Sequence, residues 1–135
     1  MSTFNVPHIA VVNDDTVFLS LMHELLGDEG YKTTIIKASN KAYDMIRRDV
    51  PDLVVLDIRV GSEEAGWLFL DLIRLDPTIA HIPVIVCSTD ARLLASKAEW
   101  LFEKRCDTLE KPFDLNDLLR KVSAFVGAPS NVPAS

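Results

Sequence analysis

Short apolar runs alternate along the chain with longer segments that have helical patterns. Five runs have the composition of β-strands and are separated by ten or more residues: "HIAVV" (8–12), "KTTII" (32–36), "DLVVL" (52–56), "PVIVC" (83–87) and "DTLE" (107–110). Alternation of this kind indicates repeated βα units and a parallel sheet. The first, third and fourth runs are almost wholly apolar, as is typical of strands covered on both sides. The sequence therefore predicts an α/β fold, a doubly wound (βα)5 sandwich with helices on both faces of the sheet.

Apolar residues recur at helical spacing between the runs, and each set predicts the buried face of one helix. The sets are Val17, Phe18, Leu21, Met22 and Leu25; Leu68, Leu72 and Leu75; and Leu115, Leu118, Leu119 and Val122.

A length of 135 residues suits one domain with a single core and is too short for two ordinary domains. We expect this domain over residues 1–127 and a disordered tail over residues 128–135, "APSNVPAS".

The net charge of the chain limits the kinds of partner that it can bind. A net charge of −6 gives no electrostatic footprint for nucleic acid or for an anionic membrane. No apolar stretch has the length of a membrane span, and the first residues lack the features of a signal peptide, so a cytoplasmic location is expected. Cys87 and Cys106 have no metal-like spacing and are interpreted as structural thiols.

Polar side chains follow the predicted strands at the points where these end. They are Asn13, Asp14 and Asp15 after the first, Asp57 after the third, Ser88 and Thr89 after the fourth, and Lys111 after the fifth. Ligands of doubly wound sheets bind beyond the carboxyl ends of the strands, so these residues are expected to converge at one edge.

The chemistry of this set indicates phosphoryl transfer. Asp14 and Asp57 suit a hard cation such as Mg²⁺, which prefers oxygen ligands. A carboxylate beside a lysine and a hydroxyl can attack a phosphoryl group whose oxygens the lysine neutralises, and Asp57 is the predicted nucleophile. Each residue alone could equally be a cap or a solvated side chain; their joint occurrence at successive strand ends favours a site.

Over residues 7–127 the chain resembles the receiver domains of two-component response regulators. The resemblance rests on "HIAVVNDDTVFLSLMHELLGDEGY", "PDLVVLDI", "IPVIVCST" and "EKPF", which occur in the family's order. It implies a flavodoxin-like five-stranded parallel sheet of strand order 2-1-3-4-5.

The resemblance also implies roles for the residues at the strand ends. Asp57 would be the phosphoacceptor, Asp14 a direct Mg²⁺ ligand, and the main-chain carbonyl of Arg59 a further ligand. Ser88 would be the hydroxyl that reorients toward the phosphoryl group, and Lys111 the lysine that contacts it. The bond between Lys111 and Pro112 is expected to be cis.

The sequence departs from the family pattern close to the site. Asn13 stands where the first acid of a pair is usual, so it would reach the metal through a water and Mg²⁺ would bind more weakly. Arg59 and Asp90 flank the phosphorylation site with opposite charges, and we hypothesise that this pair tunes dephosphorylation. Thr89 replaces a smaller residue and could narrow access to the site.

Two departures concern the output of a signal. Thr108 occupies the position of the aromatic residue that swings inward on activation in the family. In the helical segment over residues 93–101, Leu93 and Trp100 lie round from the main apolar face. They could form a partner or dimer contact, or Trp100 could merely cover the edge of the core.

These observations predict a stand-alone receiver that takes a phosphoryl group from a histidine kinase or histidine phosphotransfer protein and contacts an unknown downstream protein. It would not be an enzyme acting on a small substrate. The same interpretation allows a homodimer through the segments containing residues 93–101 and 115–122. The alternatives are a degenerate receiver that interacts constitutively, a phosphatase with an Asp nucleophile, which Arg59 disfavours, and a flavin domain, which the acidic loop "NDDT" disfavours.

Overall fold

Strands and helices alternate along the chain, as predicted. The computed structural model describes residues 6–37, 41–58 and 63–127, so the expected tail lies outside the described residues. The elements are β1 (His8–Asn13), α1 (Thr16–Asp28), β2 (Lys32–Lys37), α2 (Ala42–Asp49), β3 (Leu53–Asp57), α3 (Glu63–Leu75), β4 (Val84–Ser88), α4 (Ala91–Ser96), α5 (Ala98–Glu103), β5 (Cys106–Glu110) and α6 (Leu115–Val126).

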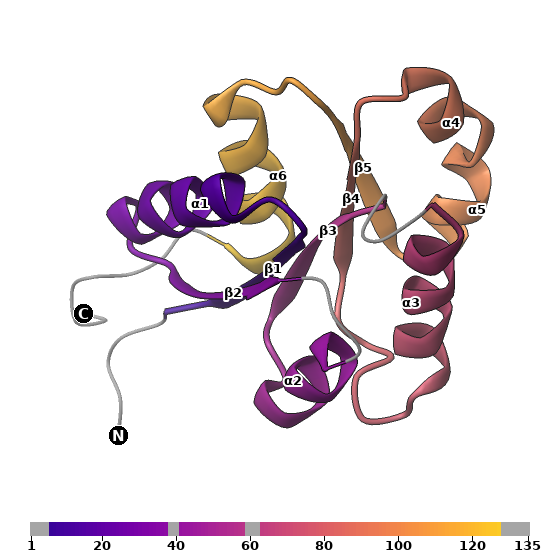
Figure 1. Cartoon of the computed structure of the whole chain (residues 1–135), viewed down its shortest axis with the longest axis horizontal. Helices are drawn as coiled ribbons and strands as arrows, with labels where there is room; N and C mark the ends of the chain where they lie inside the picture. Colours follow the sequence, from indigo (N-terminus) through magenta and orange to yellow (C-terminus); the bar gives the residue numbers. More distant parts are fainter. Residues whose placement is uncertain (1–5, 38–40, 59–62, 128–135) are drawn as a thin grey trace.

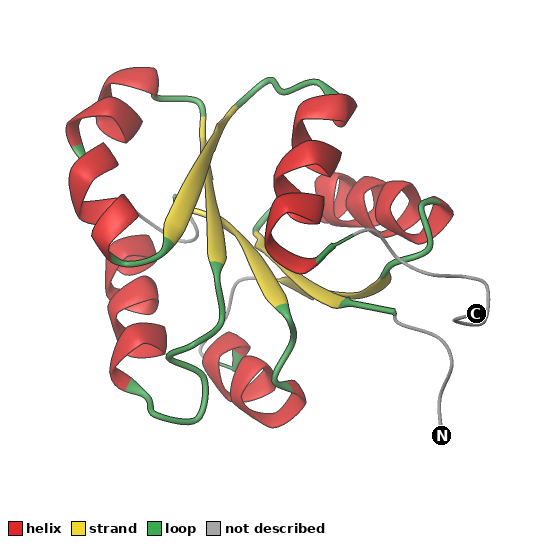
Figure 2. Cartoon of the chain, turned by 180° about the vertical axis from the view of Figure 1, so that it is seen from behind, coloured by secondary structure: helices red, strands yellow, loops and turns green. Residues whose placement is uncertain are grey.

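The five strands form one parallel sheet of order β2-β1-β3-β4-β5, which confirms the predicted fold. Helices α1 and α6 cover one face of the sheet, and α2, α3, α4 and α5 cover the other (Figures 1 and 2). The strand order reverses at β1, which lies between β2 and β3. A crevice for a ligand is therefore expected beyond the carboxyl ends of β1 and β3.

Two apolar layers enclose the sheet. Successive residues of β1, β3 and β4 point alternately into one layer and the other. Both faces of these strands are therefore buried, which explains why they are apolar throughout. Leu118 and Val122 of α6 are fully buried in one layer, as predicted. None of the helices in the described part of the chain has both the length and the apolar character that crossing a membrane requires.

The buried face of α1 differs from the prediction. Leu19, Met22 and Leu26 are buried, whereas Val17 is 76% and Leu21 is 49% exposed. The first turn of α1 contains apolar residues on several sides, so the sequence pattern allowed two neighbouring faces.

The buried face of α3 is the opposite of the predicted one. Leu70 and Ile73 are fully buried, whereas Leu68, Leu72 and Leu75 are 60%, 41% and 79% exposed. The helix is apolar on two sides, and helical spacing alone could not decide which side faces the sheet.

Gly66 explains which face of α3 packs inward. A Cβ atom at this position would lie 1.9 Å from the carbonyl oxygen of Ile58 and 2.6 Å from its carbonyl carbon. Only glycine allows the first turn of α3 to approach the end of β3 so closely.

The helix expected around residues 93–101 is divided in two. Helix α4 ends at Ser96, and Lys97, with φ −104° and ψ 2°, joins it to α5. Residues 91–103 include neither proline nor glycine, so no helix breaker in the sequence predicts this division.

Arg74 connects α3 to the two segments beside it. Its guanidinium donates to the carbonyl oxygens of Lys104 at 2.6 Å, Ile82 at 2.7 Å and Ala80 at 3.4 Å. Burial lowers the pKa of Arg74 from its ordinary value. A partly buried guanidinium with several acceptors fixes the end of α5, the start of β5 and the loop before β4 relative to one another.

At Thr108, the middle residue of β5, two side chains bind the backbone groups on the outer edge of the sheet. The Thr108 N–H donates to Asp107 Oδ1 at 2.7 Å, and the Thr108 carbonyl oxygen accepts from Lys121 Nζ. Lys121 also pairs with Asp107 at 3.3 Å. Backbone groups that could join a further strand are therefore already satisfied at this position.

Both cysteines are buried and free, which agrees with structural thiols. Burial raises the pKa of Cys87 to about 12 and also raises that of Cys106. Such thiols are protonated at neutral pH and poorly reactive.

Candidate functional site

The ends of three neighbouring strands bring the predicted residues to one edge of the sheet. Asp57 is level with Cys87 in the register of β3 and β4, so Ser88 is one residue further along. On the other side of β3, Val12 is level with Leu56, which places Asn13 beside Asp57. Asn13 and Ser88 are buried, with 4% and 1% of their surface exposed.

The Asp57 carboxylate is the centre of the site. Its Oδ2 atom lies 2.6 Å from Lys111 Nζ and accepts a hydrogen bond of 3.2 Å from Asn13 Nδ2. The side chains of Asp57 and Lys111 are 18% and 19% exposed. A charge-assisted hydrogen bond at this distance, partly shielded from water, is strong enough to hold the lysine against the carboxylate.

Lys111 is placed by its backbone and by an aromatic ring. Its N–H donates to the Ser88 carbonyl at 2.8 Å, which continues the ladder between β4 and β5. The peptide bond to Pro112 is cis, as the resemblance predicted. Lys111 Nζ also lies 4.5 Å from the ring centroid of Phe18, a contact that the sequence did not predict because Phe18 fitted a core stripe.

Asn13 links the site to the start of α1. Its Oδ1 accepts from the Asp15 N–H at 2.8 Å, and Asp15 in turn caps the helix by accepting from Val17 and Phe18. Asp15 is therefore a capping residue, and the Asn13 amide spans the gap between this turn and Asp57.

Ser88 links the site to α4. Its hydroxyl accepts from the Asp90 N–H at 3.0 Å, and Asp90 caps α4 by accepting from the Leu93 N–H at 3.1 Å. Thr89 between them is exposed. A hydroxyl that turned toward Asp57 would give up its bond to Asp90 at the start of α4.

The oxygen atoms near Asp57 suit a hard cation. Asp14 is exposed immediately after β1, next to Asn13. Within residues 6–37, 41–58 and 63–127, no group of three or more His, Cys, Asp or Glu side chains could hold a metal ion. The donors that the described residues offer here are carboxylate and amide oxygens, which fit Mg²⁺ that keeps several waters and do not fit a soft metal. Arg59, the predicted carbonyl ligand and partner of Asp90, lies outside the described residues.

Leu93 and Trp100 pack against the core and are only partly exposed. The Trp100 ring meets that of Trp67 edge-to-face, with centroids 5.7 Å apart and planes at 85°. Lys97 Nζ lies 5.5 Å from the Trp67 ring and 5.9 Å from the Trp100 ring. These contacts favour the covering role of Trp100 that the sequence left open.

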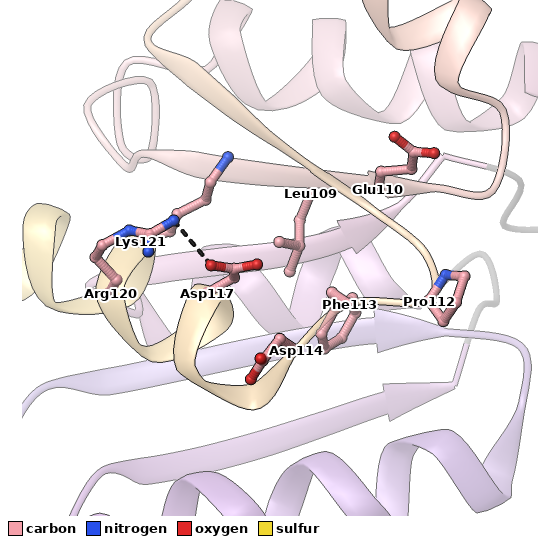
Figure 3. A pocket seen from close by; sticks show the side chains of 8 residues that line it. All are labelled: Leu109, Glu110, Pro112, Phe113, Asp114, Asp117, Arg120 and Lys121. Carbon is pink, nitrogen blue, oxygen red and sulfur yellow. Dashed lines mark ion pairs between the residues drawn. The ribbon is translucent and has the colours of Figure 1, made fainter.

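A polar hollow of about 450 Å³ lies between β5 and α6 (Figure 3). It is lined by Leu109, Glu110, Pro112, Phe113, Asp114, Asp117, Arg120 and Lys121. Asp117 and Arg120 pair within it at 2.9 Å. Asp57 does not line this hollow, so it is separate from the strand-end site.

Known proteins match this chain over most of its length. The family model described as the response regulator receiver domain matches residues 9–123. The regulatory protein VirG of Rhizobium rhizogenes is 26% identical over 115 residues, which are 85% of this chain and 46% of VirG. The polar-differentiation response regulator DivK of Brucella ovis is 25% identical over 124 residues, 88% of this chain and 95% of DivK. The chain thus spans about half the length of one relative and nearly all of the other.

Solved structures share the fold. The receiver domain of sensor histidine kinase PA1611 from Pseudomonas aeruginosa PAO1, which has a magnesium ion coordinated in its active site cleft, superposes with a TM-score of 0.74 at 22% identity. The match covers 91% of this chain and 99% of that one. Chemotaxis protein CheY4 of Vibrio cholerae matches with a TM-score of 0.75 at 17% identity, over 90% of this chain and 99% of CheY4.

Proposed function

The chain belongs to the family of response regulator receiver domains of two-component systems, and we propose that it accepts a phosphoryl group on Asp57 from a histidine kinase or histidine phosphotransfer protein. Phosphorylation would then change its contacts with a downstream protein. The observation that carries this proposal is the Asp57 carboxylate at the end of β3, held 2.6 Å from Lys111 Nζ beside the Asn13 amide.

The proposed transfer uses the residues of this edge in distinct ways. A carboxylate oxygen of Asp57 attacks the phosphorus atom, and the bond to the leaving imidazole nitrogen or acetate oxygen breaks with its electron pair. Lys111 neutralises charge on the transferred group. The Ser88 hydroxyl would turn and donate a hydrogen bond to a phosphoryl oxygen. Its oxygen would then no longer accept from the Asp90 N–H, which would alter the start of α4.

Asp14 and Asp57 are the residues that would hold Mg²⁺, together with the carbonyl of Arg59 and a water on Asn13. The bound ion would neutralise charge that develops on the phosphoryl group during transfer. In this proposal Asp14 and Asp57 supply two carboxylates. A site with an acid in place of Asn13 would supply a third, so the affinity of this protein for Mg²⁺ should be lower.

Asn13→Asp is expected to tighten Mg²⁺ binding about tenfold, or ~1.4 kcal/mol, because it adds a charge beside Asp57. The dissociation constant can be measured by following backbone amide shifts during a Mg²⁺ titration. Asn116→Asp, which adds the same charge at an exposed position of α6, is the control and should leave the affinity unchanged. Equal affinities in wild type and Asn13→Asp would contradict this account of the site.

Intact-mass analysis after incubation with acetyl phosphate and Mg²⁺ tests the proposed function. We expect a single phosphoryl adduct that is lost in Asp57→Ala and when the metal is chelated. Asp28→Ala, at the exposed end of α1, should still form the adduct. A folded wild-type protein that gains no adduct under any metal condition would refute phosphorylation at Asp57.

A degenerate receiver that binds its partner constitutively is the second candidate. Asn13 in place of an acid and Thr108 in place of an aromatic residue favour it. It predicts partner binding that is equal for the wild type and for Asp57→Ala, whereas the proposed switch predicts a difference after phosphorylation.

A further inference from the structure

The Lys111 ammonium group lies between a carboxylate and the face of an aromatic ring. Its Nζ atom is 2.6 Å from Asp57 Oδ2 and 4.5 Å from the centroid of the Phe18 ring. A cation within about 6 Å of a ring centroid is attracted by the negative face of the ring. Phe18 therefore acts on the same atom that binds Asp57.

The backbone of Phe18 and its ring are each held by a contact. The backbone N–H donates to the capping residue Asp15 at 3.3 Å, which fixes the first turn of α1. Phe113 meets the ring edge-to-face, with centroids 6.2 Å apart and planes at 84°. Because Phe113 is only two residues after Lys111, the segment that carries the lysine also holds the ring that the lysine contacts.

Phe18 lies at the edge of the core. Leu19, Met22 and Leu26 are the buried residues of α1, and Phe18 is partly buried and packs against their layer. A lysine side chain has four rotatable bonds and loses much conformational freedom when its ammonium group is fixed in one place. A rigid ring beside the ammonium reduces the positions that it can adopt.

We propose that Phe18 is a positioning residue for Lys111, which keeps the ammonium group against Asp57 and within reach of a phosphoryl group on it. The part of this inference that concerns the phosphoryl group rests on the proposed function. The contact between ring and ammonium stands without it.

The first test measures the geometry and requires no phosphorylation. In wild type, the Lys111 Hε and Cε signals should be shifted upfield by the ring current, with the assignment checked by their loss in Lys111→Arg. Phe18→Leu should return them to ordinary lysine values, while Phe18→Tyr, which keeps the ring, should retain the shift. Phe102→Leu, at a residue of α5 that is 82% exposed, is the matched control and should change nothing.

The second test measures the consequence for transfer. The rate of phosphorylation by acetyl phosphate should fall about five- to tenfold in Phe18→Leu, as expected for the loss of a cation–π contact. Phe18→Tyr should recover it. A thermal unfolding curve for each variant separates this effect from a general loss of stability.

The outcomes distinguish this inference from the proposed function. An unshifted Lys111 signal in wild type overturns the positioning role, whatever the phosphorylation result. A wild-type rate in folded Phe18→Leu overturns it as well, while Asp57 remains the phosphoacceptor. If the shift is present but wild type takes no phosphoryl group, the proposed function fails, while the contact of Phe18 with Lys111 is supported.

Discussion

Gly66→Ala is expected to lower the free energy of unfolding by about 3 kcal/mol, because the new methyl group has no space. It would lie 1.9 Å from the Ile58 carbonyl oxygen, and all of the closest atoms belong to the backbone. Backbone cannot rotate away as a side chain can, so α3 must move off the end of β3. Ile58 directly follows Asp57, and the phosphorylation rate should fall together with the stability.

Gly27→Ala is the matched control for this prediction. Gly27 lies in α1, and a Cβ atom there would meet nothing within 4 Å. Alanine is the better helix former by about 0.8–1 kcal/mol in a helix interior, so this variant should be slightly stabilised. Urea denaturation of both variants gives the two free energies. If Gly66→Ala also gained stability, the close approach of α3 to Ile58 would be wrong.

Arg74→Met is expected to cost about 3 kcal/mol, because it removes the donors shared by three carbonyl groups while keeping most of the apolar stem. Arg74→Lys should recover only part of this loss, since an ammonium cannot reproduce the planar fork of the guanidinium. The start of β5 should loosen locally, and the buried Cys106 thiol, 3.7 Å from Arg74 Nη2, should react faster with alkylating reagents.

Arg92→Met on α4 is the comparison for Arg74. Arg92 is exposed, and substitutions at exposed positions usually change stability by less than about 0.5 kcal/mol. Chemical denaturation and the alkylation rate of Cys106 are the measurements. An Arg74→Met variant as stable as Arg92→Met would show that the three carbonyls do not depend on this side chain.

The sheet could be predicted from the sequence because five strand-like runs alternate with helical segments, and β1, β3 and β4 are almost wholly apolar. The faces of α1 and α3 could not, since both helices have apolar residues on more than one side. The face of α3 depends on Gly66 meeting Ile58, a contact made only after folding. The break at Lys97 has no local signal at all.

The site could be predicted in part for a related reason. Asn13 and Asp57 end β1 and β3, which are neighbours in the sheet, and Lys111 follows β5, which is separated from β3 only by β4. The carboxyl ends of these parallel strands share one edge of the sheet, which could be predicted from the sequence. Phe18 comes from the first turn of a helix and contacts Lys111 through its ring face, and no spacing rule connects the two residues. The bond from Asp90 to the Ser88 hydroxyl depends on a turn conformation that the sequence does not specify.

The bonded backbone groups at the edge of β5 limit how other proteins can bind there. With the Thr108 N–H and carbonyl groups bonded to Asp107 and Lys121, an extended peptide cannot add to the sheet at that point without first displacing both side chains. A partner that binds at Thr108 would therefore contact side chains and helix surfaces instead of pairing with the backbone. Bonded backbone groups at a sheet edge disfavour pairing with the edge of another copy, so we expect Lys121→Ala to form sheet-rich assemblies more readily at high concentration.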